Sequence, residues 1–186
     1  LGALYRALST GGDVEDAALP ALPLQYVDYA AWQRGDELWR QLESSREYWR
    51  VQLREGDLPV LELPTELPRP ATQTFNGASV RFGLAAETVV RLVALGRAHG
   101  CTTYQVILGL WALLLCRHAG QEDVVIGSPH HGRDAAGTEG LIGYFVNVLA
   151  LRIDVLRGGS VEALLRGTRT AAIDGMRHAL VPFQQV

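Results

Sequence analysis

The sequence has little of several features that would point to particular classes of protein. It contains two cysteines, Cys101 and Cys116, too few for a disulfide scaffold or a cysteine-rich metal cluster. The formal net charge of −3 gives no electrostatic reason to expect binding to nucleic acid or to an anionic membrane. No signal-peptide pattern, internal repeat or low-complexity tract is visible. These absences leave an ordinary globular protein, for which we expect a cytoplasmic location.

Long apolar runs are also missing. The longest, from Val106 to Cys116, is about half of the ~20 residues that a bilayer-spanning helix needs, so it predicts a buried helix. The chain has 186 residues and is 48% hydrophobic, which is enough to bury a core, and one domain is the default at this length. The first residue is Leu1 instead of methionine, which fits a piece of a longer polypeptide.

Changes of hydrophobic periodicity along the chain predict helices packed on a mixed sheet, that is, a mixed α/β (α+β) fold. Helical spacing is found in residues 1–8, 34–54, 86–99, 102–118 and 161–178. Gly56 is the expected end of the second helix, Gly100 separates the next two, and Ser160 caps the last. Strand-like patterns are found in residues 77–84, 123–128 and 145–155. Residues 58–70, with four prolines, should run extended.

The segment from Leu141 to Arg152 is the most informative one. If it is a strand, alternation places Asn147 on the same face as apolar side chains. A buried amide without partners costs about 1–3 kcal/mol, so Asn147 must bond either the backbone of a neighbouring loop or a substrate. Spacing alone leaves both interpretations open. Arg152 falls on the opposite face, where pairing with Asp154 is the structural alternative.

Several stretches, in order along the chain, resemble the condensation domains of nonribosomal peptide synthetases. The segment 141–152 resembles the motif Ile-Gly-x-Phe-Val-Asn-Thr-x-x-x-Arg, and Tyr26 to Gln33 resembles Tyr-x-Asp-Tyr-Ala-x-Trp-Gln. His178 to Val186 is similar to the family's His-Gln-Asp-x-Pro-Phe-Glu segment. Residues 63–70 and 125–133 are similar to other recurrent family stretches.

The resemblance implies an architecture and a reaction. The family has two lobes, each like chloramphenicol acetyltransferase, with the active site in a channel between them. Residues 26–186 would form the second lobe, truncated at its end, and residues 1–25 the tail of the first lobe. The implied reaction joins a donor acyl or peptidyl thioester to an acceptor aminoacyl thioester through an amide bond. Both substrates are carried on phosphopantetheine arms, so the implied partners are donor and acceptor carrier proteins, neighbouring synthetase domains and the first lobe, with no cofactor bound directly.

The resemblance also implies site residues. Asn147, Arg152 and Trp32 would line the channel, and the loop that contains Gly132, Arg133 and Gly143 would bridge the lobes beneath it. The structural alternatives are a core position for Trp32 and a solvated loop position for Arg133.

The family's catalytic signature, His-His-x-x-x-Asp-Gly, lies before the segment that Tyr26 begins, and it is missing from this chain. We therefore expect no catalytic residue here and no activity from the chain alone. A similar string starts at His130, but its Asp134 comes one residue too early and Ala135 follows it. The alternative to a missing catalytic residue is that His131 acts as the catalytic base. Two adjacent histidines also form a weak metal pattern, but no further ligand lies at metal-binding spacing, so we expect no metal.

The chain departs from the family pattern at four positions: Val148, Ala179, Leu180 and Gln184. The last three remove two carboxylates from the final motif, which leaves open a non-catalytic module that recruits carrier proteins or a tailoring enzyme. An epimerisation or heterocyclisation relative is the remaining alternative, but such relatives usually lack the combination of Phe145, Asn147 and Arg152.

Overall fold

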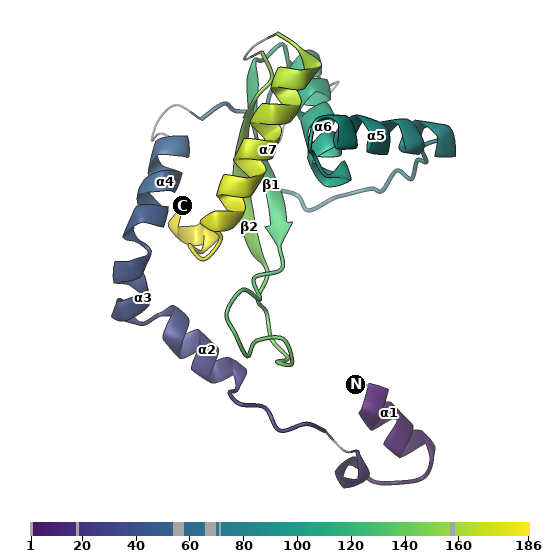
Figure 1. Cartoon of the computed structure of the whole chain (residues 1–186), viewed down its shortest axis with the longest axis vertical. Helices are drawn as coiled ribbons and strands as arrows, with labels where there is room; N and C mark the ends of the chain where they lie inside the picture. Colours follow the sequence, from purple (N-terminus) through teal and green to yellow (C-terminus); the bar gives the residue numbers. More distant parts are fainter. Residues whose placement is uncertain (1, 18, 54–57, 66–69, 71, 157–158) are drawn as a thin grey trace. The chain divides into compact units, whose positions relative to one another are not determined.

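A computed structural model describes residues 2–17, 19–53, 58–65, 70, 72–156 and 159–186 (Figure 1). The chain divides into two compact units. The first consists of Leu1–Gln41 and Arg133–Phe145, and the second of Leu42–Gly132 and Val146–Val186.

The first unit packs a short helix against a loop from much later in the sequence. Its helical elements are α1 (Gly2–Ser9), η1 (Val14–Asp16), α2 (Tyr26–Gln33) and α3 (Asp36–Gln41). At the start of α2 the Asp28 carboxylate accepts a hydrogen bond from the Gln25 backbone N–H at 2.7 Å, which satisfies a donor that the helix leaves open. Tyr29 of α2 and Leu141 and Phe145 of the loop form the buried cluster of this unit.

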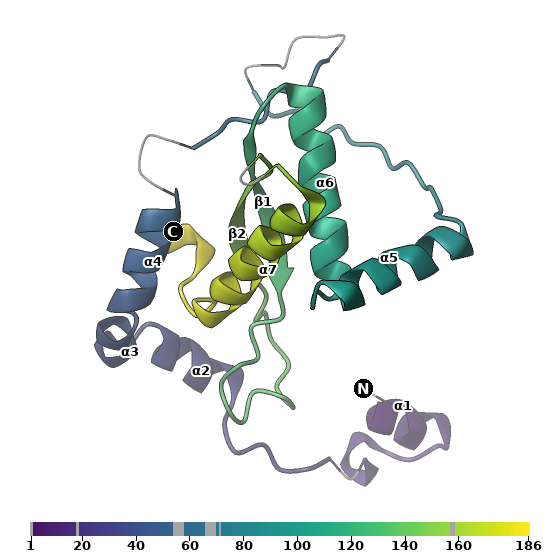
Figure 2. The ribbon, with the colours of Figure 1, turned by 45° about the horizontal axis from the view of Figure 1, so that its top comes forward.

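The second unit is built on an antiparallel strand pair. Strand β1 (Asp123–His130) pairs with β2 (Asn147–Asp154), with Asp123 opposite Asp154 and His130 opposite Asn147. Helix α6 (Thr103–Ala119) contacts β1, and α7 (Val161–Arg177) lies along β2 and beside α6 (Figures 1 and 2). Helix α5 (Ala86–Ala98) packs on α6, while α4 (Glu43–Leu53) and η2 (Phe183–Gln185) complete the described elements. The sequence-predicted combination of helices and a sheet is confirmed, and in the described residues that sheet is antiparallel.

Local signals account for the ends of the two long helices. Thr102 accepts a hydrogen bond from the Gln105 backbone N–H at 3.2 Å, and Gln105 accepts one from the Thr102 N–H at 2.9 Å, a complete capping box for α6. Gly120 ends α6 at a φ of 66°, the left-handed conformation that glycine adopts without strain. Ser160 caps α7 by accepting from the Ala163 N–H at 3.1 Å, as predicted.

Close approach of α6 and α7 depends on a small residue. A Cβ atom added at Gly109 would lie 2.9 Å from the Thr168 hydroxyl, so a larger residue would push the helices apart. Val106 and Leu165, both fully buried, belong to the apolar cluster between these helices.

The predicted helix over 34–54 is wrong as a single element. The structure divides it into α3 and α4, with a turn at Leu42. Leu38 and Leu42 are nevertheless both buried, because apolar periodicity reports which residues face a core and not whether the backbone is continuous. Arg54 and the expected end at Gly56 lie outside the described residues.

The predicted strand over 77–84 is also wrong, since the structure shows no strand there. Val80 and Phe82 are 87% and 82% exposed. Alternation alone does not make a strand, because a strand also needs a partner edge and a surface to cover. Residues 58–65 run without regular structure, as predicted, and the Gln121 side-chain amide bonds the backbone of Val60 and Glu62 there. Residues 66–69 of that segment lie outside the described part.

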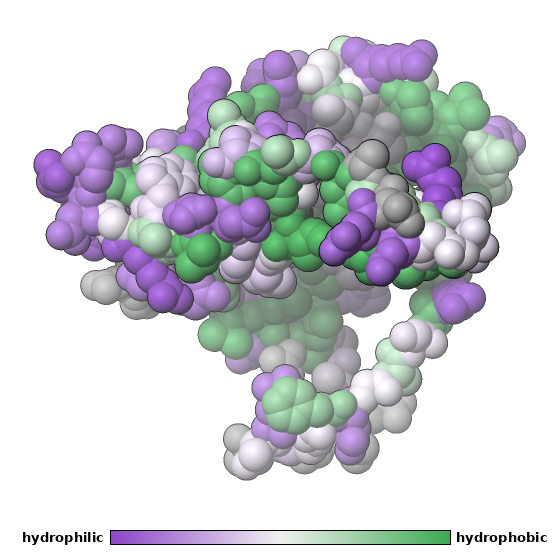
Figure 3. Space-filling model, turned by 90° about the horizontal axis from the view of Figure 1, so that it is seen from below, coloured by the Kyte–Doolittle hydropathy of each residue, from purple (hydrophilic) through white to green (hydrophobic). Residues whose placement is uncertain are grey.

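Helix α6 is less buried than its apolar sequence predicts. Its buried side holds Val106, Leu108 and Ala112, but a stripe at helical spacing is 45–49% exposed, namely Tyr104, Ile107, Trp111 and Leu114. Apolar side chains also remain between hydrophilic ones on the face drawn in Figure 3. Among the described residues, no single helix has the length and apolar character to cross a membrane, and α5 with α6 meets that test only as a pair bent by 103°.

Candidate functional site

Asn147, the first residue of β2, is bonded entirely to the turn that follows α7. Its Nδ2 donates to the carbonyl oxygens of Ala179 at 2.8 Å and Val181 at 2.7 Å. Its Oδ1 accepts from the Phe183 backbone N–H at 3.0 Å. Both amide protons are therefore used, and one lone pair of Oδ1 is left for any further contact. The tie to a neighbouring loop is present in the structure, and a contact with substrate stays a prediction.

The same turn is held from α4 as well. The Trp49 indole N–H donates to the His178 carbonyl at 3.0 Å, and the Ser45 hydroxyl lies 2.9 Å from His178 Nδ1. The Tyr48 ring stacks on the His178 ring, with centroids 4.1 Å apart. The segment from His178 to Phe183 thus joins α4, α7 and β2. The sequence predicts a helix over Ser45, Tyr48 and Trp49 from its helical spacing. That spacing does not reveal these contacts.

Tyr48 is a neutral phenol in this setting. Burial, followed by the nearby Asp174 carboxylate, raises the pKa of Tyr48 to about 12. Both effects disfavour the phenolate, because one removes water and the other adds a like charge.

Arg152 braces the strand pair. Its Nε donates to Asp123 at 2.7 Å, diagonally across the ladder, and the two side chains are 22% and 26% exposed. A long bond of 3.5 Å runs from Arg152 Nη1 to the Gln52 carbonyl of α4. The same arginine lines a cleft of about 440 Å³ between β2, α4 and α7. Sequence reasoning singled out Asp154 as its partner and overlooked Asp123, since strand register is not readable from one strand.

Trp32 lies on a cleft of the first unit and not in its core. The side chain is 43% exposed, and its ring centroid is 5.6 Å from that of Tyr29. The cleft measures about 300 Å³, and Asp28 of α2 and Thr138 of the loop also line it. Burial, then the charges of Tyr26 and Asp134, raises the pKa of Tyr29 at its wall.

The predicted bridging loop is closely packed. The Arg133 guanidinium sits 4.1 Å from the centre of the Phe145 ring and also bonds the Thr138 carbonyl. Arg133 is therefore not merely a solvated loop residue. At Gly143 a Cβ atom would lie 2.2 Å from the Tyr26 ring, so only glycine fits there. Gly132, on the second unit's side of the loop, has a φ of 66°.

The two histidines lie at the end of β1. His130 is the last residue of the strand, and His131 follows it. Their rings are stacked with centroids 4.6 Å apart. The catalytic alternative for His131 stays a hypothesis.

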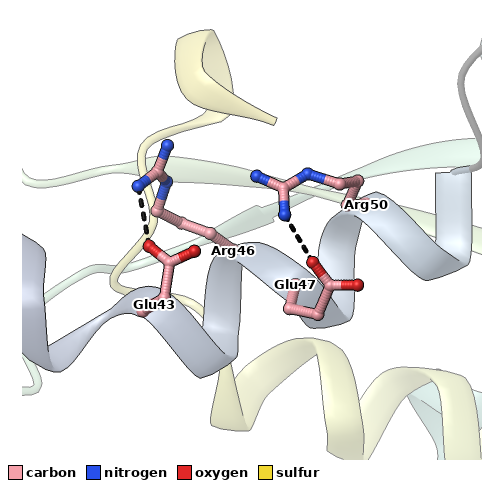
Figure 4. Close-up of polar contacts among 4 residues, drawn as sticks. All are labelled: Glu43, Arg46, Glu47 and Arg50. Carbon is pink, nitrogen blue, oxygen red and sulfur yellow. Dashed lines mark hydrogen bonds and ion pairs between the residues drawn. The ribbon is translucent and has the colours of Figure 1, made fainter.

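The outer face of α4 is a solvated charged surface. Arg46 pairs with Glu43 at 2.9 Å, and Arg50 pairs with Glu47 one turn later (Figure 4). These side chains are 38–62% exposed, so each pair contributes roughly 0–1 kcal/mol. Since each arginine already has a carboxylate beside it, this face is a poor candidate for an anion site.

The whole chain matches a known protein family. The family model described as "Condensation domain" covers residues 1–186. Malpinin synthetase of Mortierella alpina is 41% identical over 186 residues, which cover 100% of this chain and 2% of that protein. The chain therefore belongs to the condensation-domain family.

Two solved structures share the fold. The first condensation domain of the CDA synthetase is 25% identical with a TM-score of 0.69, over 98% of this chain and 39% of that one. The X-domain from teicoplanin biosynthesis is 25% identical with a TM-score of 0.81, over 97% of this chain and 40% of that one. This chain spans well under half of either solved chain, and a still smaller share of the synthetase.

Proposed function

We propose that residues 26–186 form the second lobe of a condensation domain, with residues 1–25 as the tail of the first. In this role the lobe helps to form an amide bond between a donor acyl or peptidyl thioester and an acceptor aminoacyl thioester. The observation that carries the proposal is the Asn147 bonding to Ala179, Val181 and Phe183. It joins two of the segments that resemble condensation motifs into one junction, within a chain that the family model matches throughout.

The chemistry assigns the lobe a positioning role. The acceptor amine attacks the donor carbonyl, the thiolate leaves, and the ammonium proton passes to a base. Holding two thioesters end to end makes the reaction nearly unimolecular, which is worth roughly 7–11 kcal/mol. The base adds about 10²–10⁴-fold and would come from the His-His-x-x-x-Asp-Gly signature of the first lobe.

Asn147, Arg152 and Trp32 are the proposed channel residues of this lobe. Trp32 is 43% exposed beside a cleft, which suits contact with a substrate or with the first lobe. The loop with Gly132, Arg133 and Gly143 is the proposed bridge between the lobes. The proposed partners are donor and acceptor carrier proteins, whose phosphopantetheine arms deliver both substrates.

A second candidate function has one observation in its favour. Ala179, Leu180 and Gln184 replace the residues usual in the last motif and remove two carboxylates from it, which supports a non-catalytic module that recruits carrier proteins or a tailoring enzyme.

Reconstitution separates the two candidates. The complete domain, incubated with donor- and acceptor-loaded carrier proteins, should give an amide product detectable by mass spectrometry. The product should vanish when the second signature histidine is replaced by alanine. Carrier binding without product would favour the recruiting module. The 186-residue chain alone should give no product, and a product that disappears in His131→Ala would make His131 the base.

A further inference from the structure

The second unit holds a cleft that the proposed channel residues leave unused. It measures about 210 Å³ and lies between α6, α7 and the ends of β1 and β2 nearest the connecting loop. Its floor is apolar and buried, with Leu149, Leu151 and Ala172 each at most 4% exposed. Tyr104 and Met176 stand at its rim, 47% and 46% exposed.

A pair of hydroxyl groups provides the polar side of this cleft. The Tyr104 hydroxyl and Ser128 Oγ are 2.6 Å apart, and Ser128 is 8% exposed. Two hydroxyls carry two protons, and their mutual hydrogen bond uses one of them. Within the described part of the chain neither hydroxyl has another hydrogen-bond partner. One O–H donor therefore remains at the wall of the cleft, which His130 also lines.

The composition of the cleft selects a class of ligand. Apart from the His130 imidazole, no ionisable carboxylate, lysine or arginine is among the described residues that line it, so a charged group would lose its hydration without gaining a permanently charged counter-ion. An apolar group gains from the floor, and the remaining O–H donor favours a carbonyl acceptor beside it. The volume suits one aliphatic side chain or short acyl chain.

We propose that this cleft binds the short acyl group of a thioester substrate, with the thioester carbonyl accepting a hydrogen bond from the Tyr104–Ser128 pair. Tyr104, Ser128 and Ala172 would then determine which acyl groups the domain accepts. The proposal rests on the proposed function for its substrate class.

Met176 provides a direct readout, because it is the sole methionine of the 186-residue sequence. A ¹³C-methyl label there gives one resonance at the rim of the cleft. The chain is titrated with S-isovaleryl-N-acetylcysteamine, a thioester, and with S-isopentyl-N-acetylcysteamine, the thioether that lacks the carbonyl. The thioester should shift the resonance saturably and bind about fivefold or more tightly than the thioether, the effect of one hydrogen bond.

Two variants and one control localise the effect. In the double variant Tyr104→Phe with Ser128→Ala, the thioester and thioether should bind equally well. Ala172→Leu should abolish binding of both by filling the floor. Tyr5→Phe removes a hydroxyl from a tyrosine that is 74% exposed in the other unit, and it should change nothing.

The proposal is overturned if the thioester gives no saturable shift, or if its preference over the thioether survives in the double variant. Failure here is distinguishable from failure of the proposed function. If the double variant of the complete domain forms amide product normally and its acyl preference does not change, only the cleft proposal is contradicted. If the complete domain forms no product while the titration behaves as expected, the proposed function is contradicted and the cleft proposal stands.

Discussion

Two neighbouring positions where the loop between β1 and β2 meets β2 are held by different forces. At the β2 end, Asn147 makes three hydrogen bonds to the backbone of one turn. Two residues earlier, Phe145 is held by ring packing, with its centroid 4.7 Å from Tyr29 and 5.2 Å from Tyr26, and by the Arg133 guanidinium. The first kind of contact is directional and the second is not. The Asn147 position should therefore reject isosteres, while the Phe145 position should accept other apolar side chains.

The largest effect is expected at Asn147. Replacing it with alanine leaves the Ala179 and Val181 carbonyls without their partner, and these residues are 4% and 1% exposed. At roughly 1–3 kcal/mol for each unsatisfied group, the free energy of unfolding should fall by about 3 kcal/mol, measured by urea denaturation. Asn147→Asp, of the same shape, should be no better because it faces two carbonyls with acceptors only.

The same variant tests the channel role of Asn147. If the rate of amide formation in the complete domain falls further than the folded fraction does, Asn147 also contacts the reacting groups. A rate that follows the folded fraction would leave it a purely structural residue.

Phe145→Leu should cost less, about 1–2 kcal/mol, because a shape-tolerant apolar contact is exchanged for a smaller one. Thermal unfolding of the variant measures this, with Phe75→Leu as the control, since Phe75 is 85% exposed. A loss as large as that of Asn147→Ala would remove the contrast between the Phe145 and Asn147 positions.

Ser45→Ala tests a single weaker contact of the turn that Asn147 holds. It removes the hydroxyl that lies 2.9 Å from His178 Nδ1, which should lower the free energy of unfolding by about 1 kcal/mol. Ser44→Ala, at the neighbouring exposed position of α4, is the matched control. Equal effects of the two substitutions would mean that the His178 contact contributes nothing.

The effect of Tyr48 is confined to alkaline pH and should be absent at neutral pH. Its folded pKa of about 12 exceeds the ordinary value of 10.0, so the folded state holds the proton more tightly. The stability that this contributes is complete below pH 10 and is lost as the pH rises toward 12. Denaturation between these pH values should show a slope that Tyr48→Phe reduces. An unchanged slope would show that Tyr48 titrates as an ordinary exposed phenol.

Motifs in the family's order were enough to predict the family and the mixed fold, but not the contacts of the site. His178 belongs to one of these motifs, yet Ser45, Tyr48 and Trp49, which contact it, lie on a helix far earlier in the sequence. No periodicity carries such information. Asn147 is satisfied, as the cost of an unsatisfied buried amide predicts, but its partners could not be named from spacing.

Features that depend on neighbouring residues could be read directly from the amino-acid order. Ser160 places the start of α7 because a cap acts within one turn, and the alternation from Leu149 to Ile153 places a buried strand face. Contacts between distant segments required the folded chain: Arg152 pairs with Asp123, Asn147 bonds the turn after α7, and residues 77–84 form no strand. The physical reason is that such pairing is governed by packing of the whole chain and not by the preferences of neighbouring residues.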